Sequence, residues 1–372
     1  MKHPYEHPKR KTKVVFVQLG SPSEPTPKAL RNYLREFLGD PRVVDINPWL
    51  WKIILNFFVL PFRPRKSAKL YERIWDGKSF PLITNTRNFT QSVREKLKNI
   101  DHEGHVEVNH AFLLSPPYVN EVYDSWENDL RNGVGATKLL VIPMFPQYSE
   151  STIASGIDAL AKELSKRVKI PTFEVITNFH RTHAFIDNSI KLVDTKLSQL
   201  MKQGKKIDSL IITFHGMQKR RIVSKGDDYY RHCYETFCLI TNNLKNIEVK
   251  YCFMSFQSRF GSEEWITPYT EDVVQDLISK GKKEIVIYSP SFVADCLETT
   301  DELGHELVND AKEWGGNIYP VECLNTDNGW CKDFAKYTFV QAEGSAQDKE
   351  DIEYKLEKKY YQKMPELIMN KA

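Results

Sequence analysis

A histidine and a carboxylate in the second half of the chain have the residue types and positions that catalysis needs. His215 ends a mostly apolar run and is followed by Gly216. A single histidine is more often structural, but the carboxyl end of a parallel strand is where an imidazole can meet a ligand. Because imidazole titrates near neutral pH and binds transition metals, His215 is a candidate base and metal ligand.

Asp295 and Glu298 lie three residues apart, where a predicted loop enters a predicted helix. Two interpretations fit this spacing. It is typical of a capping box, in which side chains bind main-chain N–H groups at the start of a helix. It equally suits catalytic carboxylates, and neither interpretation excludes the other. Cys296, between them, is by default a small buried apolar residue.

Common nucleotide and metal motifs are absent from the sequence. The first predicted strand ends in Leu19 and Gly20 without the further glycines of a dinucleotide-binding loop, and no GxxxxGK[ST] motif occurs. The histidines show no HExxH or paired spacing, which argues against a dedicated zinc site. The segment 143–149 (PMFPQYS) leaves the third predicted strand and would give a cleft an aromatic wall.

Eight short apolar runs, alternating with amphipathic stretches, must position these residues. Near-continuous apolar runs are typical of strands buried on both faces, as in parallel sheets covered by helices. Their alternation with helical patterns such as 229–243, 269–280 and 298–314 predicts doubly wound α/β domains, each with a four-stranded parallel sheet flanked by helices. The predicted strands are 14–20, 106–114, 138–145 and 171–178, and then 209–216, 249–258, 284–293 and 317–325.

Composition limits the class of protein. With 372 residues the chain is long for one core, so two domains are expected. The formal net charge is only +3, which gives no strongly basic footprint for nucleic acid. Residues 1–13 are polar and cannot be a signal peptide, and the six cysteines show no CxxC spacing. We therefore expect reduced thiols in a cytoplasmic protein, and an exported solute-binding protein is disfavoured.

The segment 49–62 (WLWKIILNFFVLPF) is far more apolar than the rest and is followed by Arg63, Arg65 and Lys66. It is too short to span a bilayer, which needs about 20 apolar residues. Either it is a buried core helix, or it is an apolar lip flanked by basic residues, suited to a hydrophobic ligand or a membrane surface.

The chain contains several long sequence motifs that, in the same order, resemble those of the ferrochelatase family over roughly residues 14–325. They are LGSP at 19–22, RNYLREFLGDPRVV at 31–44, PFRPRKSAKLYERIW at 61–75, FPQYS at 145–149, FHGM at 214–217, KGDDYY at 225–230, FQSRFGSEEWITPYT at 256–270 and FVADCLETTDELG at 292–304.

The resemblance implies the chelatase fold, two Rossmann-like domains with a porphyrin between them, and Fe²⁺ as a substrate. We expect domains at 14–178, with the lip at 49–62, and 179–330, followed by a helical tail at 331–372. The part of this tail beyond about residue 345 lies outside the resemblance, and its charged sequence after residue 349 predicts a closing helix. His215 and Glu298 match the family's catalytic and metal-binding residues, supported by Asp295 and Cys296. The matched substrate-binding residues are Leu19, Trp49, Leu50, Tyr148, Gln257, Ser258 and Trp265.

The sequence also departs from the family pattern. The second predicted strand reads HAFLLS at 110–115, without the family's usual arginine, so contacts to porphyrin propionates are expected to differ. No cysteine follows Cys331, so no C-terminal iron–sulfur cluster and no permanently bound cofactor are expected. Leu19 stands where the coproporphyrin-using branch tends to have tyrosine, which favours protoporphyrin IX.

The predicted function is insertion of Fe²⁺ into protoporphyrin IX to give protohaem, in a cytoplasmic enzyme with peripheral membrane contact through 49–66. Three alternatives stay open. A degenerate relative would bind porphyrin or haem without turnover, and a coproporphyrin ferrochelatase would use another substrate. A sirohydrochlorin chelatase is less consistent, because those enzymes typically use paired histidines for the metal.

Overall fold

The computed structural model describes residues 11–131, 136–261, 263–356 and 361. The chain divides into two compact units, which are described separately. The first unit comprises Met1–Phe145, Glu150–Asn178 and Thr326–Asp351. The second unit comprises Pro146–Ser149, Phe179–Asn325 and Ile352–Ala372.

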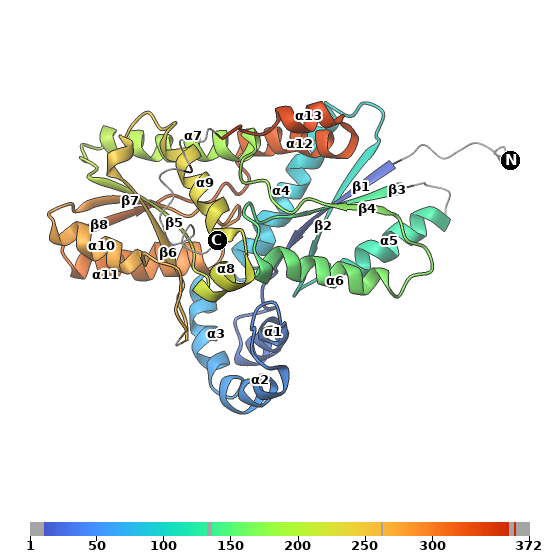
Figure 1. The fold of residues 1–372 in the computed structure, drawn as a ribbon, viewed down its shortest axis with the longest axis horizontal. Coiled ribbons are helices and arrows are strands. Elements are labelled where there is room, and N and C mark those ends of the chain that lie inside the picture. The colour runs from blue at the N-terminus through green and yellow to red at the C-terminus, as the bar shows by residue number, and fades with distance from the viewer. Residues whose placement is uncertain (1–10, 132–135, 262, 357–360, 362–372) are drawn as a thin grey trace. The chain divides into compact units, whose positions relative to one another are not determined.

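The first unit is built on a four-stranded parallel sheet (Figure 1). The strand order is β2-β1-β3-β4, so the chain reverses its direction of winding between β1 and β3. The central strand β1 is almost wholly buried, as its apolar sequence requires. The strands are β1 (Lys11–Gln18), β2 (Val106–Phe112), β3 (Ala136–Pro143) and β4 (Thr172–Val175).

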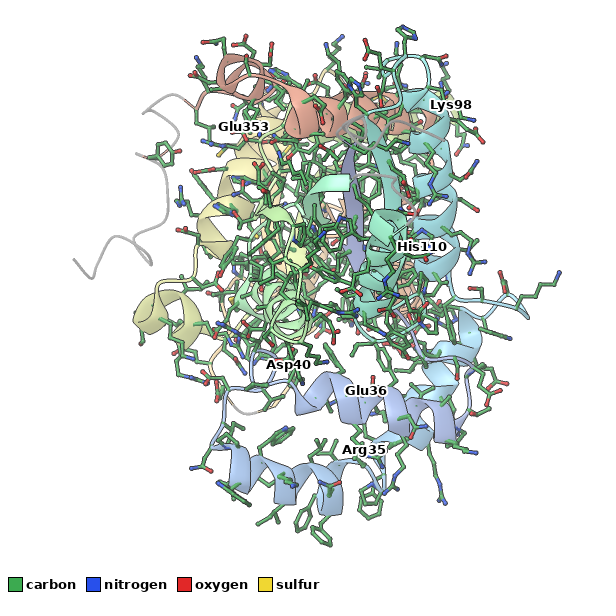
Figure 2. All side chains as sticks on the ribbon, turned by 90° about the vertical axis from the view of Figure 1, so that its right-hand side faces the viewer. Arg35, Glu36, Asp40, Lys98, His110 and Glu353 are labelled. Atoms are coloured by element: carbon green, nitrogen blue, oxygen red, sulfur yellow. The ribbon has the colours of Figure 1, made fainter. Side chains whose placement is uncertain are left out.

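The longer helices of the first unit are amphipathic and bury one face. Figure 2 shows Arg35 and Glu36 on α1, both exposed, whereas Tyr33 and Leu34 of the same helix are buried. The helical elements are α1 (Pro27–Gly39), α2 (Pro48–Ile54), the π-helix η1 (Leu55–Val59), α3 (Arg63–Arg73), α4 (Pro81–Leu97), α5 (Val119–Arg131), the π-helix η2 (Glu150–Ala154), α6 (Ser155–Leu164), α12 (Asn328–Glu343) and α13 (Ala346–Asp351).

The second unit repeats the plan with the parallel order β6-β5-β7-β8. Its strands are β5 (Ser209–His215), β6 (Cys252–Gln257), β7 (Glu284–Tyr288) and β8 (Asn317–Pro320). Its helices are α7 (His183–Lys202), α8 (Lys219–Lys225), α9 (Tyr229–Thr241), the short 3₁₀ turn η3 (Val249–Tyr251), α10 (Thr270–Ser279), the π-helix η4 (Glu298–Glu306) and α11 (Leu307–Glu313).

The predicted fold class is confirmed, because every predicted run overlaps one strand of a four-stranded parallel sheet. The helix predicted over 298–314 differs in form. It begins as the π-helix η4, in which the Leu307 N–H bonds to the Glu302 carbonyl, and becomes α-helical only in α11.

The segment expected as a separate helical tail, 331–372, is not one piece. Helix α12 packs on the first unit, where Phe334 lies against Phe16 of β1 and Trp330 stacks on Phe89 of α4. These aromatic residues are buried, so the apolar surface of α12 explains its place in the core. The charged closing helix predicted beyond residue 349 falls largely outside the described residues.

Candidate active site

His215 lies at the carboxyl end of β5, the strand beside which the second sheet reverses its winding. Main-chain contacts fix this position on both sides. The His215 N–H donates to Ser291 Oγ at 3.0 Å, beyond the end of β7, and the His215 carbonyl accepts from the Tyr229 hydroxyl at 2.9 Å. Tyr229 is the first residue of α9, so this helix is tied directly to the strand end.

The imidazole of His215 has one ring nitrogen engaged and one available. Its Nδ1 lies 2.7 Å from the Gly216 carbonyl oxygen. A carbonyl oxygen can only accept, so Nδ1 carries the proton of the neutral ring. The Nε2 lone pair is therefore oriented for a proton or a metal ion. The ring is partly exposed, with Phe292 at its edge.

The end of β6 lies beside His215 and is packed closely. Gln257 is the register partner of His215, and its carbonyl accepts the Gly216 N–H at 2.7 Å. The Trp265 ring lies against Gly216, where a Cβ atom would come within 2.9 Å of the indole. The Gln257 Nε2 and Trp265 Nε1 atoms are buried without hydrogen-bond partners among the described residues. Trp265 is thus a buried support for the strand end.

Carboxylates on the π-helix η4 extend the site. Glu298 opens this helix and is partly buried. Glu302 follows one turn later, and its Oε2 accepts a hydrogen bond from the Ser258 hydroxyl, just beyond β6. Burial, and then the negative charge of Glu298, raise the pKa of Glu302 to about 7. A carboxyl group with this pKa exchanges protons readily at neutral pH.

Asp295 joins the entry of η4 to the segment after β8. Its Oδ1 accepts from the Thr299 hydroxyl at 2.9 Å and from the Cys323 N–H at 3.2 Å. The capping box considered for Asp295 and Glu298 is wrong: η4 has Leu297 at its N-cap and no side-chain cap. Asp295 binds the Thr299 side chain rather than the first free N–H groups of the helix. Cys296 is buried, and burial raises the pKa of its thiol well above the ordinary value.

A cavity of about 260 Å³ opens between the end of β6, η4 and α10. Ser258 and Glu302 lie on its wall, and most of its charged side chains are acidic. No group of three or more His, Cys, Asp or Glu residues is arranged as a metal site in the part of the chain that the structure describes. The acids of the cavity are Glu271, Asp272, Glu302, Glu306 and Asp310.

The other predicted substrate-binding residues lie on different elements. Leu19 follows β1 in the first unit and is partly buried, with its carbonyl bonded to the Leu114 N–H. Trp49 and Leu50 lie on α2 of the same unit and are 80% and 53% exposed. Tyr148 belongs to the second unit, in the short segment Pro146–Ser149. Leu19, Trp49 and Leu50 are therefore in the first unit, whereas Tyr148 is in the second unit with His215.

The apolar segment 49–62 is not a buried core helix. Leu55 and Leu60 point into the first unit, but most of its large side chains are exposed. None of the described helices is long and apolar enough to cross a bilayer. The lip interpretation therefore fits the observed surface. The exposed members are Trp49, Leu50, Ile53, Phe57, Phe58 and Phe62.

Sequence reasoning did not identify Glu302 and Tyr229 as parts of this site, whereas Ser291 was expected at this sheet edge as a strand-end polar residue and does contact His215. A signal for Glu302 was present, because acids at 298, 302 and 306 recur every four residues. Such spacing keeps side chains nearly aligned on a π-helix, whose hydrogen bonds span five residues. Tyr229 reaches His215 only through a tertiary contact, which no local pattern reveals.

The fold of this chain has counterparts among solved structures. The structure of SirB from Bacillus subtilis with Fe³⁺ matches with a TM-score of 0.50 and 12% identity, covering 93% of this chain and 100% of that one. At this identity the likeness shows the fold alone, which is the chelatase fold.

Sequence comparisons are more specific. A family model described as Ferrochelatase matches residues 11–341. The ferrochelatase of Idiomarina loihiensis is 38% identical over 317 residues, 85% of this chain and 84% of that protein. The ferrochelatase of Herminiimonas arsenicoxydans is 37% identical over 335 residues, 90% of this chain and 88% of that protein. The chain belongs to the ferrochelatase family, whose enzymes are lyases of haem biosynthesis that insert Fe²⁺ into a porphyrin.

Proposed function

We propose that the chain inserts Fe²⁺ into protoporphyrin IX, with His215 and Glu298 as its catalytic residues. The observation that carries this proposal is the hydrogen bond from His215 Nδ1 to the Gly216 carbonyl, which leaves Nε2 as a lone pair beside a partly open strand end. Metal insertion needs such a base, because two pyrrole N–H protons must leave the macrocycle as the cation enters it.

In the proposed mechanism His215 accepts a pyrrole proton at Nε2 and can also hold the incoming metal ion. Glu298 binds the cation with His215 and accepts or passes on protons. Glu302 is suited to receive a proton from Glu298, because its pKa of about 7 lets it take up and release a proton near neutral pH. Asp295 fixes the start of η4, and therefore the position of Glu298, through Thr299.

The porphyrin is proposed to contact apolar and aromatic residues. A flat apolar macrocycle needs an apolar slot with few polar contacts. Leu19, Trp49, Leu50 and Tyr148 would contribute apolar surface, while Gln257, Ser258 and Trp265 would shape the wall beside His215. A small apolar Leu19 is the reason for preferring protoporphyrin IX, which carries two apolar vinyl groups where coproporphyrin carries propionates.

The exposed apolar face of 49–62 is proposed to contact a membrane surface in a cytoplasmic enzyme. Helix α2 and η1 present Trp49, Phe57 and Phe58 to solvent, at 80%, 70% and 67% exposure. Cationic side chains of α3 follow directly. An apolar face beside cationic residues is typical of helices that lie in the interface of an anionic bilayer.

Metallation of two porphyrins by the purified protein tests the proposal. With Fe²⁺ under anaerobic conditions, we expect protoporphyrin IX to be converted at least tenfold faster than coproporphyrin III, a difference of about 1.4 kcal/mol in transition-state binding. A faster reaction with coproporphyrin would identify the other branch. Tight porphyrin binding without metallation by Fe²⁺ or Zn²⁺ would identify a porphyrin carrier.

A further inference from the structure

The aromatic segment Pro146–Ser149 is held by side chains of α9. Although it follows β3 of the first unit in sequence, it belongs to the second unit. The Gln147 side chain donates from Nε2 to Thr236 Oγ1 at 3.1 Å and to the Pro290 carbonyl at 3.4 Å. The Pro146 carbonyl accepts the Phe179 N–H at 3.0 Å.

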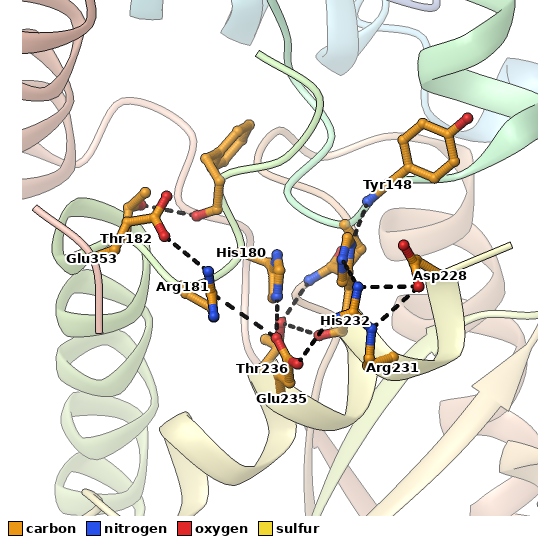
Figure 3. Close-up of polar contacts among 12 residues, drawn as sticks. Tyr148, His180, Arg181, Thr182, Asp228, Arg231, His232, Glu235, Thr236 and Glu353 are labelled. Carbon is orange, nitrogen blue, oxygen red and sulfur yellow. Dashed lines mark hydrogen bonds and ion pairs between the residues drawn. The ribbon is translucent and has the colours of Figure 1, made fainter. Parts of the chain in front are cut away.

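The central contact of this segment is made by His232. The main-chain N–H of Tyr148 donates to His232 Nδ1 at 3.1 Å (Figure 3). An amide N–H can only donate, so Nδ1 must be unprotonated. A charged imidazole would lose this bond. His232 is 5% exposed, and burial together with neighbouring His180 and Arg231 lowers its pKa to about 2, which keeps the acceptor neutral.

A second buried layer supports the imidazole of His232. The His180 ring stacks on it, with centroids 4.0 Å apart and planes at 19°. His180 Nε2 lies 2.6 Å from Glu235 Oε2, and Glu235 is itself 2% exposed. Burial lowers the pKa of His180, so its neutral ring donates to the Glu235 carboxylate. That negative charge is balanced by Arg231 at 3.5 Å and Arg181 at 4.0 Å (Figure 3).

The same face of α9 also reaches the proposed base. Tyr229, His232 and Thr236 are spaced at i, i+3 and i+7, which places them on one side of the helix. The first bonds to the His215 carbonyl, the second to the Tyr148 amide and the third to Gln147. One rigid helix therefore fixes the aromatic segment and the catalytic strand end in a common frame.

We propose that His232 is a positioning residue for porphyrin binding: through the Tyr148 amide it holds the aromatic segment at a set distance from His215. The inference rests on the proposed function, in which Tyr148 contacts the porphyrin. His232 itself touches neither the macrocycle nor the metal in this scheme. Losing this acceptor loosens the segment at Tyr148, although Gln147 still holds it, and part of the binding free energy of the porphyrin is then spent on ordering Tyr148.

Two substitutions distinguish the effect of losing the hydrogen-bond acceptor of His232 from the effect of changing its side-chain volume. Asparagine places Oδ1 where histidine has Nδ1, so His232→Asn keeps an acceptor for the Tyr148 N–H, whereas His232→Leu keeps bulk and loses the acceptor. We expect His232→Leu to raise the Kd and KM for porphyrin about tenfold with a smaller change in kcat, the effect of about one hydrogen bond. His232→Asn should stay within about threefold of the wild-type protein.

Porphyrin Kd is measured by fluorescence quenching, which does not depend on metallation. The positioning role of His232 can therefore fail while the wild-type protein still inserts Fe²⁺, and it can hold even if the protein binds porphyrin without inserting the metal. The double variant Tyr148→Ala with His232→Leu completes a double-mutant cycle. In the Tyr148→Ala background, His232→Leu should change the porphyrin Kd little, because the tyrosine ring that His232 positions is already absent. His183→Asn, an exposed histidine of α7, is the matched control and should bind like wild type. Any of three results would overturn the proposal. His232→Leu could bind porphyrin as tightly as wild type, or His232→Asn could bind as weakly as His232→Leu. In the third, the factors by which Tyr148→Ala and His232→Leu raise the Kd would simply multiply in the double variant.

Discussion

Ser258 donates its hydroxyl to Glu302, joining the end of β6 to the π-helix η4. Ser258 adopts a positive φ of 63°, so the backbone turns sharply where this contact is made. The hydrogen bond favours the charged carboxylate, but burial and the nearby Glu298 outweigh it and raise the pKa of Glu302 to about 7. The same carboxyl group is thus partly buried, hydrogen-bonded and able to change its charge at neutral pH.

Replacing Glu302 by glutamine should remove a pH dependence of stability. The folded pKa lies above the ordinary value of 4.5, so the folded protein holds a proton that the unfolded chain releases. The contribution of Glu302 is complete below pH 4.5, falls as the pH rises to about 7 and is constant above it. Denaturant unfolding of wild type and Glu302→Gln should show their difference changing across this window. Glu313→Gln, at an exposed position of α11, is the control, and an identical pH response of all three proteins would contradict the assignment.

His215→Ala and Glu298→Gln should each lower kcat for Fe²⁺ insertion by at least about 100-fold, the usual loss when a positioned acid or base is removed. Among the described residues, the His215 side chain hydrogen-bonds only to the adjacent Gly216 carbonyl, so folding should be nearly intact. Initial metallation rates and thermal unfolding measure the two effects. His305→Ala, also on η4 but exposed, should keep wild-type activity. Activity near wild type in His215→Ala would reject the proposed base.

Gly216→Ala should destabilise the protein and disturb His215. A Cβ atom there would lie 2.7 Å from the Gln257 carbonyl oxygen and 2.9 Å from the Trp265 ring, so strand ends or indole must move. We expect a loss of about 1–3 kcal/mol in the free energy of unfolding, typical of overpacking a filled site. Gly39→Ala is the control, because nothing lies within 4 Å of the added carbon. Equal stabilities of the two variants would show that the site repacks freely.

Trp49→Ser and Phe58→Ser should weaken binding to vesicles that contain anionic phospholipid. Each removes a large side chain that is at least two-thirds exposed, and transfer of such a ring to the bilayer interface contributes about 1–2 kcal/mol. Co-sedimentation with vesicles should show several-fold weaker binding, while unfolding temperatures stay unchanged. Val168→Ser, fully exposed in the loop after α6, controls for surface apolarity and should bind like wild type. No difference between Trp49→Ser and Val168→Ser would exclude the membrane role.

The sequence alone specified the layout of this protein because its signals are local. Buried parallel strands must be apolar along their whole length, so runs such as 209–216 and 284–293 were recognisable one at a time. The position of His215 followed from the same reasoning, since a polar residue that ends such a run must lie at the sheet edge. The long sequence motifs around His215 and Glu298 then supported the family assignment.

Tertiary structure alone decided what depends on contacts between distant segments. The exposure of Trp49 could not be read from its apolar neighbours, because core helices and surface lips share that composition. The raised pKa of Glu302 needs burial and the charge of Glu298, and the lowered pKa of His232 needs burial beside the stacked His180. Free energies of desolvation and charge pairing are set by neighbours in space, which a linear pattern does not contain.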